Sequence, residues 1–158
     1  MKKFLTVGLA VATLGSATVP ATAHHSFAMF DSSQEIVIEG TVVRWNFSNP
    51  HTYMMIEDAE GTTWAFEGAA PASLVAQNPP MTGDTFPTGS PLTVVYCPLH
   101  DGRPGGAAAA FITEDGTVYT PADGGCRGGR AQQWPEWIEQ GFRSLAEVEA
   151  AGATEPDE

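Results

Sequence analysis

The stretch "EIVIEGTVVRWNFSN", residues 35–49, decides the fold. It is rich in isoleucine, valine, threonine and aromatic residues, a composition typical of β-strands. Gly40 interrupts the run, which indicates a bulge or a sharp bend within one long strand. The Asn49-Pro50 pair ends it. The sequence therefore predicts a long, bent strand near the start of the domain.

Two shorter strands follow closely. "TYMMIED" (52–58) and "TTWAFEG" (62–68) are separated by the turn sequence "AEG". Trp64 and Phe66 alternate onto one face of the second of them, as expected for a half-buried strand. The first third of the domain is therefore predicted to be a meander of three strands.

The next segments predict a short helix and more strands. Residues 71–76 favour one short helix, which Asn78-Pro79-Pro80 ends. A strand is expected over 90–99, and a hairpin over 107–120 with Asp115-Gly116 at its turn. This order predicts a mainly β fold, a small OB-like Greek-key barrel of five to six strands with the helix between strands 3 and 4. A lipocalin-like barrel or a sandwich of the same strands is the alternative.

The C-terminal part differs in composition. Residues 24–121 are predicted to form the barrel domain, and residues 122–133 a Gly-rich linker. A helix is predicted over 134–152, because its large apolar residues recur at spacings of three and four. Residues 153–158 read as a disordered acidic tail.

The N-terminal 23 residues read as a signal peptide. Lys2 and Lys3 precede an apolar stretch of 12 residues (4–15), and Ala21-Thr22-Ala23 forms an A-x-A cleavage site. The apolar stretch is shorter than the roughly 20 residues that a membrane-spanning helix needs. We therefore expect a periplasmic or secreted protein without stable membrane insertion.

Charge and motifs exclude several functions. Beyond residue 23 the chain carries five arginines and no lysine against 19 acidic residues, a formal charge of −14 (5 − 19). Such a surface repels nucleic acid. The sequence contains neither a G-x-S-x-G nucleophile elbow nor a phosphate-binding loop. We expect no catalysis.

The chain has two cysteines, Cys97 and Cys126. An even number of cysteines in an exported chain favours a disulfide. The closed loop of about 30 residues would contribute about 3 kcal/mol in the chain-entropy description. Two free thiols that ligate a metal are the alternative.

Several motifs together resemble a family of small exported bacterial proteins of unknown function. The resemblance spans about residues 24–120 and implies an exported β-domain, without an established reaction, substrate or catalytic residue. Its members begin with A-H-H-S-F after the signal and carry a later G-T-V strand, a tryptophan and an N-P-H turn. The corresponding residues are His24, His25, Ser26, Phe27, Gly40, Thr41, Val42, Trp45, Asn49, Pro50 and His51.

The chain has four histidines, and two of them would start the mature protein. After cleavage at Ala23, the α-amine and the imidazole of His24 could chelate one metal ion, and another histidine would add a third nitrogen. This arrangement, a histidine brace, suits Cu²⁺. His25 offers a rival chelate through its own imidazole. His51 and His100 lie in predicted loops that can meet at one rim of such a barrel.

Aromatic residues on the first three strands offer a different binding surface. Trp45, Tyr53 and Trp64 are the candidates for contact with a small ligand, although aromatics in these positions can also fill the barrel. We therefore expect an exported binding or accessory protein, and the sequence does not identify its ligand or protein partner. The alternative is a periplasmic copper-binding protein built on His24, His51 and, with them, His25 or His100.

Overall fold

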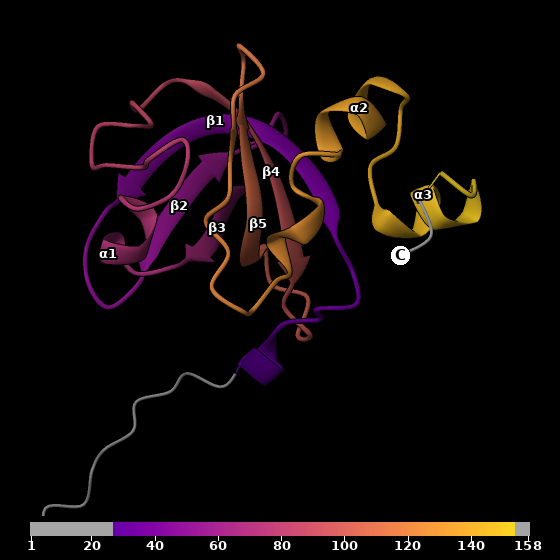
Figure 1. Ribbon diagram of the computed structural model, residues 1–158, viewed down its shortest axis with the longest axis horizontal. Helices are drawn as coiled ribbons and strands as arrows, with labels where there is room; N and C mark the ends of the chain where they lie inside the picture. The colour runs from indigo at the N-terminus through magenta and orange to yellow at the C-terminus, as the bar shows by residue number, and fades with distance from the viewer. Residues whose placement is uncertain (1–26, 154–158) are drawn as a thin grey trace, which may run out of the picture.

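The computed structural model describes residues 27–153, which form a closed β-barrel with a layer of short helices on one side (Figure 1). Its strands are β1 (Ile36–Asn46), β2 (Thr52–Glu57), β3 (Thr63–Gly68), β4 (Pro91–Pro98), β5 (Gly105–Thr113) and β6 (Val118–Tyr119). Its helices are η1 (Phe27–Met29), α1 (Pro71–Leu74), η2 (Gly128–Arg130), α2 (Trp134–Glu139) and α3 (Leu145–Ala150). Within these residues, no helix has both the length and the apolar character that crossing a membrane requires.

Strand pairing confirms the predicted fold class. The order along the sheet is β3-β2-β1-β4-β5-β6, and a parallel pairing of β3 with β5 closes five strands into a barrel. The helix α1 lies between β3 and β4, as predicted, although it is only one turn long. This connectivity is that of the OB-like Greek-key barrel, with β6 as an additional short strand.

The long first strand, β1, pairs with two neighbouring strands. Its first half pairs with β4 and its second half with β2. The register with β2 shifts between Val42 and Arg44, so the bulge lies there and not at Gly40. Gly40 serves another purpose, because a Cβ atom at this position would lie 2.6 Å from the carbonyl oxygen of Glu57. The glycine therefore allows β1 and β2 to approach closely at the bend.

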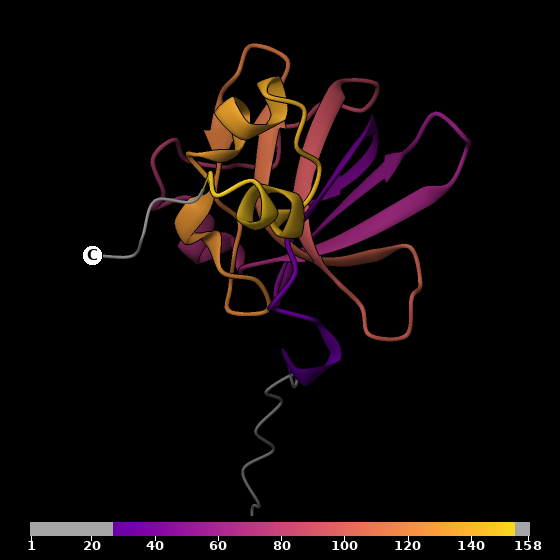
Figure 2. The same cartoon turned by 90° about the vertical axis from the view of Figure 1, so that its right-hand side faces the viewer.

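The apolar side chains form two clusters, one inside the barrel and one outside it. The inner cluster includes Met54, Ile56, Phe66, Leu74, Val94 and Phe111, each almost fully buried. The outer cluster lies between β4–β5 and the C-terminal segment, which covers that side of the barrel in Figure 2. Trp134 and Val148 of α2 and α3 are completely buried there.

The C-terminal segment differs from the prediction in two ways. The single helix expected over 134–152 is two helices, because Gly141 adopts a positive φ of 94° and Ser144 caps α3 in a capping box with Glu147. The stretch 122–133, expected to be a linker, packs against the barrel. In it Cys126 is 1% exposed and Ala131 3% exposed.

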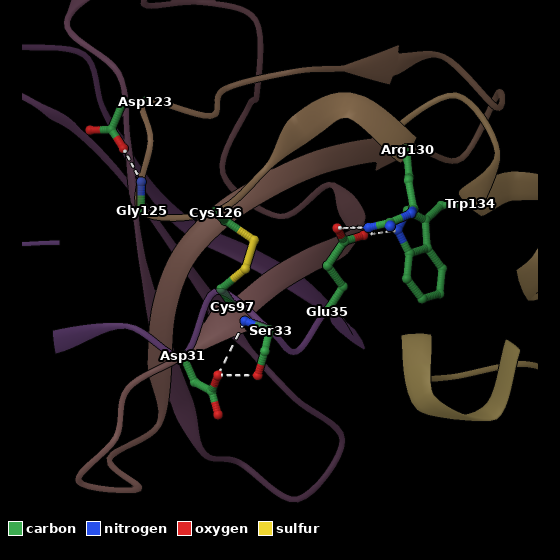
Figure 3. The surroundings of a disulfide bond; sticks show 9 residues. All are labelled: Asp31, Ser33, Glu35, Cys97, Asp123, Gly125, Cys126, Arg130 and Trp134. Carbon is green, nitrogen blue, oxygen red and sulfur yellow. Dashed lines mark hydrogen bonds and ion pairs between the residues drawn. A yellow bond between two sulfur atoms is a disulfide. The ribbon is translucent and has the colours of Figure 1, made fainter. Parts of the chain in front are cut away.

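A disulfide joins the C-terminal segment to the barrel. Cys97 of β4 and Cys126 are bonded, with a Cα–Cα distance of 5.3 Å, which confirms the predicted pairing (Figure 3). A second link between the same two parts of the chain is made by the carboxylate of Glu35, which is 3% exposed. Glu35 accepts a hydrogen bond of 2.7 Å from the indole of Trp134 and pairs with Arg130 at 3.5 Å (Figure 3). Both links fix residues 126–134 to the barrel.

Burial raises the pKa of Glu35, against the opposing effects of the Trp134 hydrogen bond and the Arg130 charge. The folded protein therefore holds this proton more tightly than the unfolded chain does. The contribution of Glu35 favours folding at low pH and is lost as the pH rises from the ordinary glutamate value of 4.5 through the raised folded value.

We therefore expect Glu35→Gln to remove one component of the pH dependence of stability. The free energy of unfolding of the variant, relative to the native chain, should increase as the pH rises above about 4.5, because glutamine pays no cost of ionisation. Urea unfolding at a series of pH values measures this difference. Glu57→Gln, at an exposed position, is the control. Parallel curves for the native chain and Glu35→Gln would contradict the assignment.

Replacement of both Cys97 and Cys126 by alanine should lower the free energy of unfolding by about 3 kcal/mol, because the open loop gains conformational freedom in the unfolded chain. Urea unfolding of the double variant measures the loss. The native chain treated with a reductant should show a loss of the same size. A change below about 1 kcal/mol in both experiments would show that the bond does not carry this stability.

Candidate metal site beside the barrel

Three side chains from three separate segments meet at the end of the barrel where β2 begins. The imidazole Nδ1 of His51 lies 3.0 Å from a carboxylate oxygen of Asp123 and 3.2 Å from one of Glu67. The three side chains are largely buried, with 21%, 13% and 10% of the surface of His51, Glu67 and Asp123 exposed. Within residues 27–153 this is the one group of three such side chains whose ligand atoms lie within 4.8 Å of one another.

Strand register brings the first two side chains together. His51 directly precedes β2, and Glu67 is the next-to-last residue of β3, which pairs antiparallel with β2. Tyr53 lies directly opposite Glu67 in this pairing. Side chains at directly opposed positions share a face of the sheet, so Tyr53 and Glu67 both point out of the barrel.

A backbone contact places the third side chain. The N–H of Ala69 donates a hydrogen bond of 2.7 Å to the carbonyl of Pro121, which brings the segment after β6 to the end of β3. Gly68 makes this approach possible, because a Cβ atom there would lie 2.9 Å from the hydroxyl of Thr52 and 3.2 Å from the Pro121 ring. The Asp123 carboxylate also accepts a hydrogen bond of 3.4 Å from the N–H of Gly125 (Figure 3). Asp123 lies three residues before Cys126, so the disulfide restrains the same segment.

The group collects negative charge around one imidazole. Burial raises the pKa of the Tyr53 hydroxyl, and the Glu67 carboxylate raises it further through its charge and through the hydrogen bond that Tyr53 donates to it. The charge of Asp123 acts in the same direction. One imidazole nitrogen and two carboxylate oxygens are ligand types that a divalent metal ion can share.

The predicted site residues fall in different places. His51 belongs to the group, whereas His100 does not and lies exposed in the loop after β4. His24 and His25 lie outside the described residues. Trp45 and Trp64 face the barrel interior, since they pair with the buried residues Met54 and Ile56. Their indole N–H groups donate to Thr82 and Asp58, whereas Tyr53 points outward.

Sequence reasoning missed Glu67 and Asp123. Nothing in the residue types distinguishes these two among 19 acidic residues, because polar residues are ordinary on the outer face of a strand and in a Gly-rich loop. The nearest signal was positional. In the predicted meander, the end of the strand that carries Glu67 lies beside the start of the strand that follows His51. Asp123 is close in sequence to one of the two cysteines.

The start of the described chain lies beside this group. Phe27 packs near Gly124, where an added Cβ atom would lie 3.3 Å from its ring. The N–H of His100 donates a hydrogen bond of 3.0 Å to the carbonyl of Met29, and Phe30 forms a β-bridge with Leu99. Residues 27–30 therefore run between the loop after β4 and the segment that carries Asp123.

A comparison with protein families identifies the chain. Residues 11–108 match the "Family of unknown function (DUF6152)". The chain belongs to this family. The match includes His24, His25, His51 and Glu67 and ends before Asp123. No curated protein and no solved structure matches the chain.

Gly68→Ala tests how the group is assembled. The added methyl group would press on Thr52 and Pro121, so we expect it to displace the segment that carries Asp123 and to cost about 1–3 kcal/mol in the free energy of unfolding. Urea unfolding measures the cost, and the NMR shift of the His51 ring reports the displacement. Gly129→Ala is the matched control, since no atom lies within 4 Å of the added carbon. Equal behaviour of both variants would contradict this account.

Proposed function

We propose that this protein is an exported binding protein whose ligand is a transition-metal ion, held by His51, Glu67 and Asp123. One observation supports this most strongly: a single imidazole nitrogen has two carboxylate oxygens within 3.2 Å, contributed by three segments of the chain. Imidazole nitrogen and carboxylate oxygen are common ligands of Zn²⁺ and Cu²⁺. No catalytic step is part of the proposal.

Copper is the metal we favour, with the mature N-terminus as the source of further ligands. Cleavage after Ala23 would give His24 a free α-amine, and the amine and imidazole of this residue would add two nitrogens to that of His51. Three nitrogens with carboxylate oxygens suit Cu²⁺ better than Zn²⁺, which is usually four-coordinate and tetrahedral. His25, through its own chelate, and His100, in the neighbouring loop, are the alternative nitrogen donors.

Chain length supports the reach of these ligands. Phe27 lies against the residue that follows Asp123, and His24 is three positions before it along the chain. Each residue of an extended chain spans at most about 3.6 Å, so three such steps from Phe27 cover at most about 11 Å. A chelating N-terminus can therefore reach the His51 group without any change in the barrel.

Export supports the same proposal. Residues 1–23 have the composition of a secretory signal, and the disulfide Cys97–Cys126 belongs to the class of bonds that persist in oxidising compartments. We place the protein in the periplasm or outside the cell. Stacking of a ligand on Trp45 and Trp64 has less support, because both side chains face the interior and both indole N–H groups are already bonded.

Calorimetric titration with Cu²⁺ of the mature chain that begins at His24 tests the proposal. His51→Ala, Glu67→Gln and Asp123→Asn should each weaken binding at least about tenfold, because each removes one metal ligand. Glu57→Gln, which removes one charge at an exposed position elsewhere, should change the affinity less than about twofold. Equal effects of Glu67→Gln and Glu57→Gln would show that only the overall charge attracts the ion.

The N-terminal ligands have a test of their own. One additional glycine before His24 should lower the Cu²⁺ affinity and change the electron paramagnetic resonance spectrum, since the His24 amine becomes a peptide nitrogen. Zn²⁺ binding serves as the comparison and should depend less on the added glycine. If Cu²⁺ binding loses its dependence on His51 but keeps its dependence on the terminus, the N-terminal chelate alone binds the ion and the His51 group is an ion pair.

A further inference from the structure

A groove of about 230 Å³ adjoins the His51 group on the outer side of the barrel. It lies over the seam where β3 and β5 pair in parallel, with Ala65 and Gly106 among its lining residues. The side chains of Met29, Phe30, Tyr53 and Leu99 form its apolar walls. Its volume is below the range of about 300–1,000 Å³ typical of ligand pockets, so only a compound of about one ring fits.

The two ends of the groove carry opposite charges. Arg103 precedes Gly105, which pairs with Ala65, whereas Glu67 lies two residues further along β3. Because β3 and β5 run parallel, Arg103 enters from the end where these strands begin, and Glu67 lies toward the other end.

The Arg103 guanidinium contacts one neighbouring carboxylate and keeps further N–H donors. Its Nε group donates a hydrogen bond of 2.8 Å to the carboxylate of Asp101. The Arg103 and Asp101 side chains are 67% and 53% exposed, and an exposed ion pair of this kind contributes little stability. A guanidinium has five N–H donors, and this contact uses one of them. The terminal N–H groups are therefore geometrically suited to a carboxylate ligand.

We propose that the groove binds a small organic carboxylate with an apolar body, oriented by Arg103. The carboxylate contacts the guanidinium, the apolar body lies between Tyr53, Phe30 and Leu99, and the far end of the ligand approaches the metal site. This inference extends the proposed function, because a metal ion on Glu67 neutralises the charge that otherwise repels an anion. We therefore expect the metal and the carboxylate to strengthen each other's binding.

The test uses benzoate as the probe and benzamide as its neutral counterpart of the same shape. The ¹⁵N-labelled mature chain, loaded with Zn²⁺, is titrated with each compound and followed by NMR. Benzoate should bind at least about fivefold more tightly than benzamide, because it gains charge-assisted hydrogen bonds to Arg103. The shifting signals should include Ala65 and Gly106. Equal affinities, or shifts confined to other residues, would overturn the proposal.

Two variants assign the preference to one residue. Arg103→Gln should abolish the preference for benzoate, whereas Arg44→Gln, at an exposed arginine of β1 that does not line the groove, should keep it. Asp101→Asn should strengthen benzoate binding, because it removes the internal competitor for the guanidinium. A preference that survives Arg103→Gln would overturn the proposal.

The same samples separate this inference from the proposed function. Cu²⁺ and Zn²⁺ binding are measured first by calorimetry, and the absence of binding of both ions would contradict the metal site alone. In that event the metal-free chain is titrated, and an Arg103-dependent preference for benzoate would still support the groove. If Zn²⁺ binds and no such preference exists in the loaded chain, the groove proposal fails while the metal site stands.

Discussion

The parallel pairing of β3 with β5 is the contact on which the rest of the structure depends. It requires a glycine at position 105, because a Cβ atom there would collide with the Ala65 carbonyl oxygen of β3. Gly106 allows an equally close approach on the other side of β5, where a Cβ atom would collide with the Cys97 carbonyl oxygen of β4. This pairing closes the barrel and encloses the aromatic interior. It also fixes the end of β3, and hence Glu67, next to the segment that follows β6. Both the candidate metal site and the adjoining groove are consequences of this closure.

The parts of the chain that surround the site are attached to the barrel, and are not part of it. Residues 27–30 are bonded to the loop after β4, through His100–Met29 and the Phe30–Leu99 bridge. Residues 121–126 are fixed by the Ala69–Pro121 hydrogen bond and by the disulfide. The site therefore lies where a rigid strand end meets two tethered segments. Such a position combines a candidate ligand at a strand end, His51, with a candidate ligand on a tethered segment, Asp123, that can adjust by small movements. This combination suits an ion whose coordination geometry the barrel alone cannot provide.

Local patterns predicted the strands, and tertiary contacts determined the rest. The alternation of "TTWAFEG" and the turn at Asp115-Gly116 are properties of neighbouring residues, so the sequence alone predicted the meander, the hairpin and the barrel class. The break of the C-terminal helix depends on Gly141 and on the cap at Ser144, which helical periodicity does not reveal. The grouping of Glu67 and Asp123 with His51 depends on barrel closure, a contact between residues far apart in sequence. Only His51 was predicted from its residue type.

The strand β5 is buried on both faces, and four consecutive alanines, Ala107–Ala110, form its centre. Ala108 belongs to the inner cluster, whereas Ala107, Ala109 and Ala110 belong to the outer one. The barrel interior and the C-terminal layer are thus separated by a wall only one methyl group thick on each side. Neither cluster can loosen without exposing the strand that supports the other. The barrel and its C-terminal layer therefore form one cooperative unit, and the helices behave as a part of the core that lies outside the barrel.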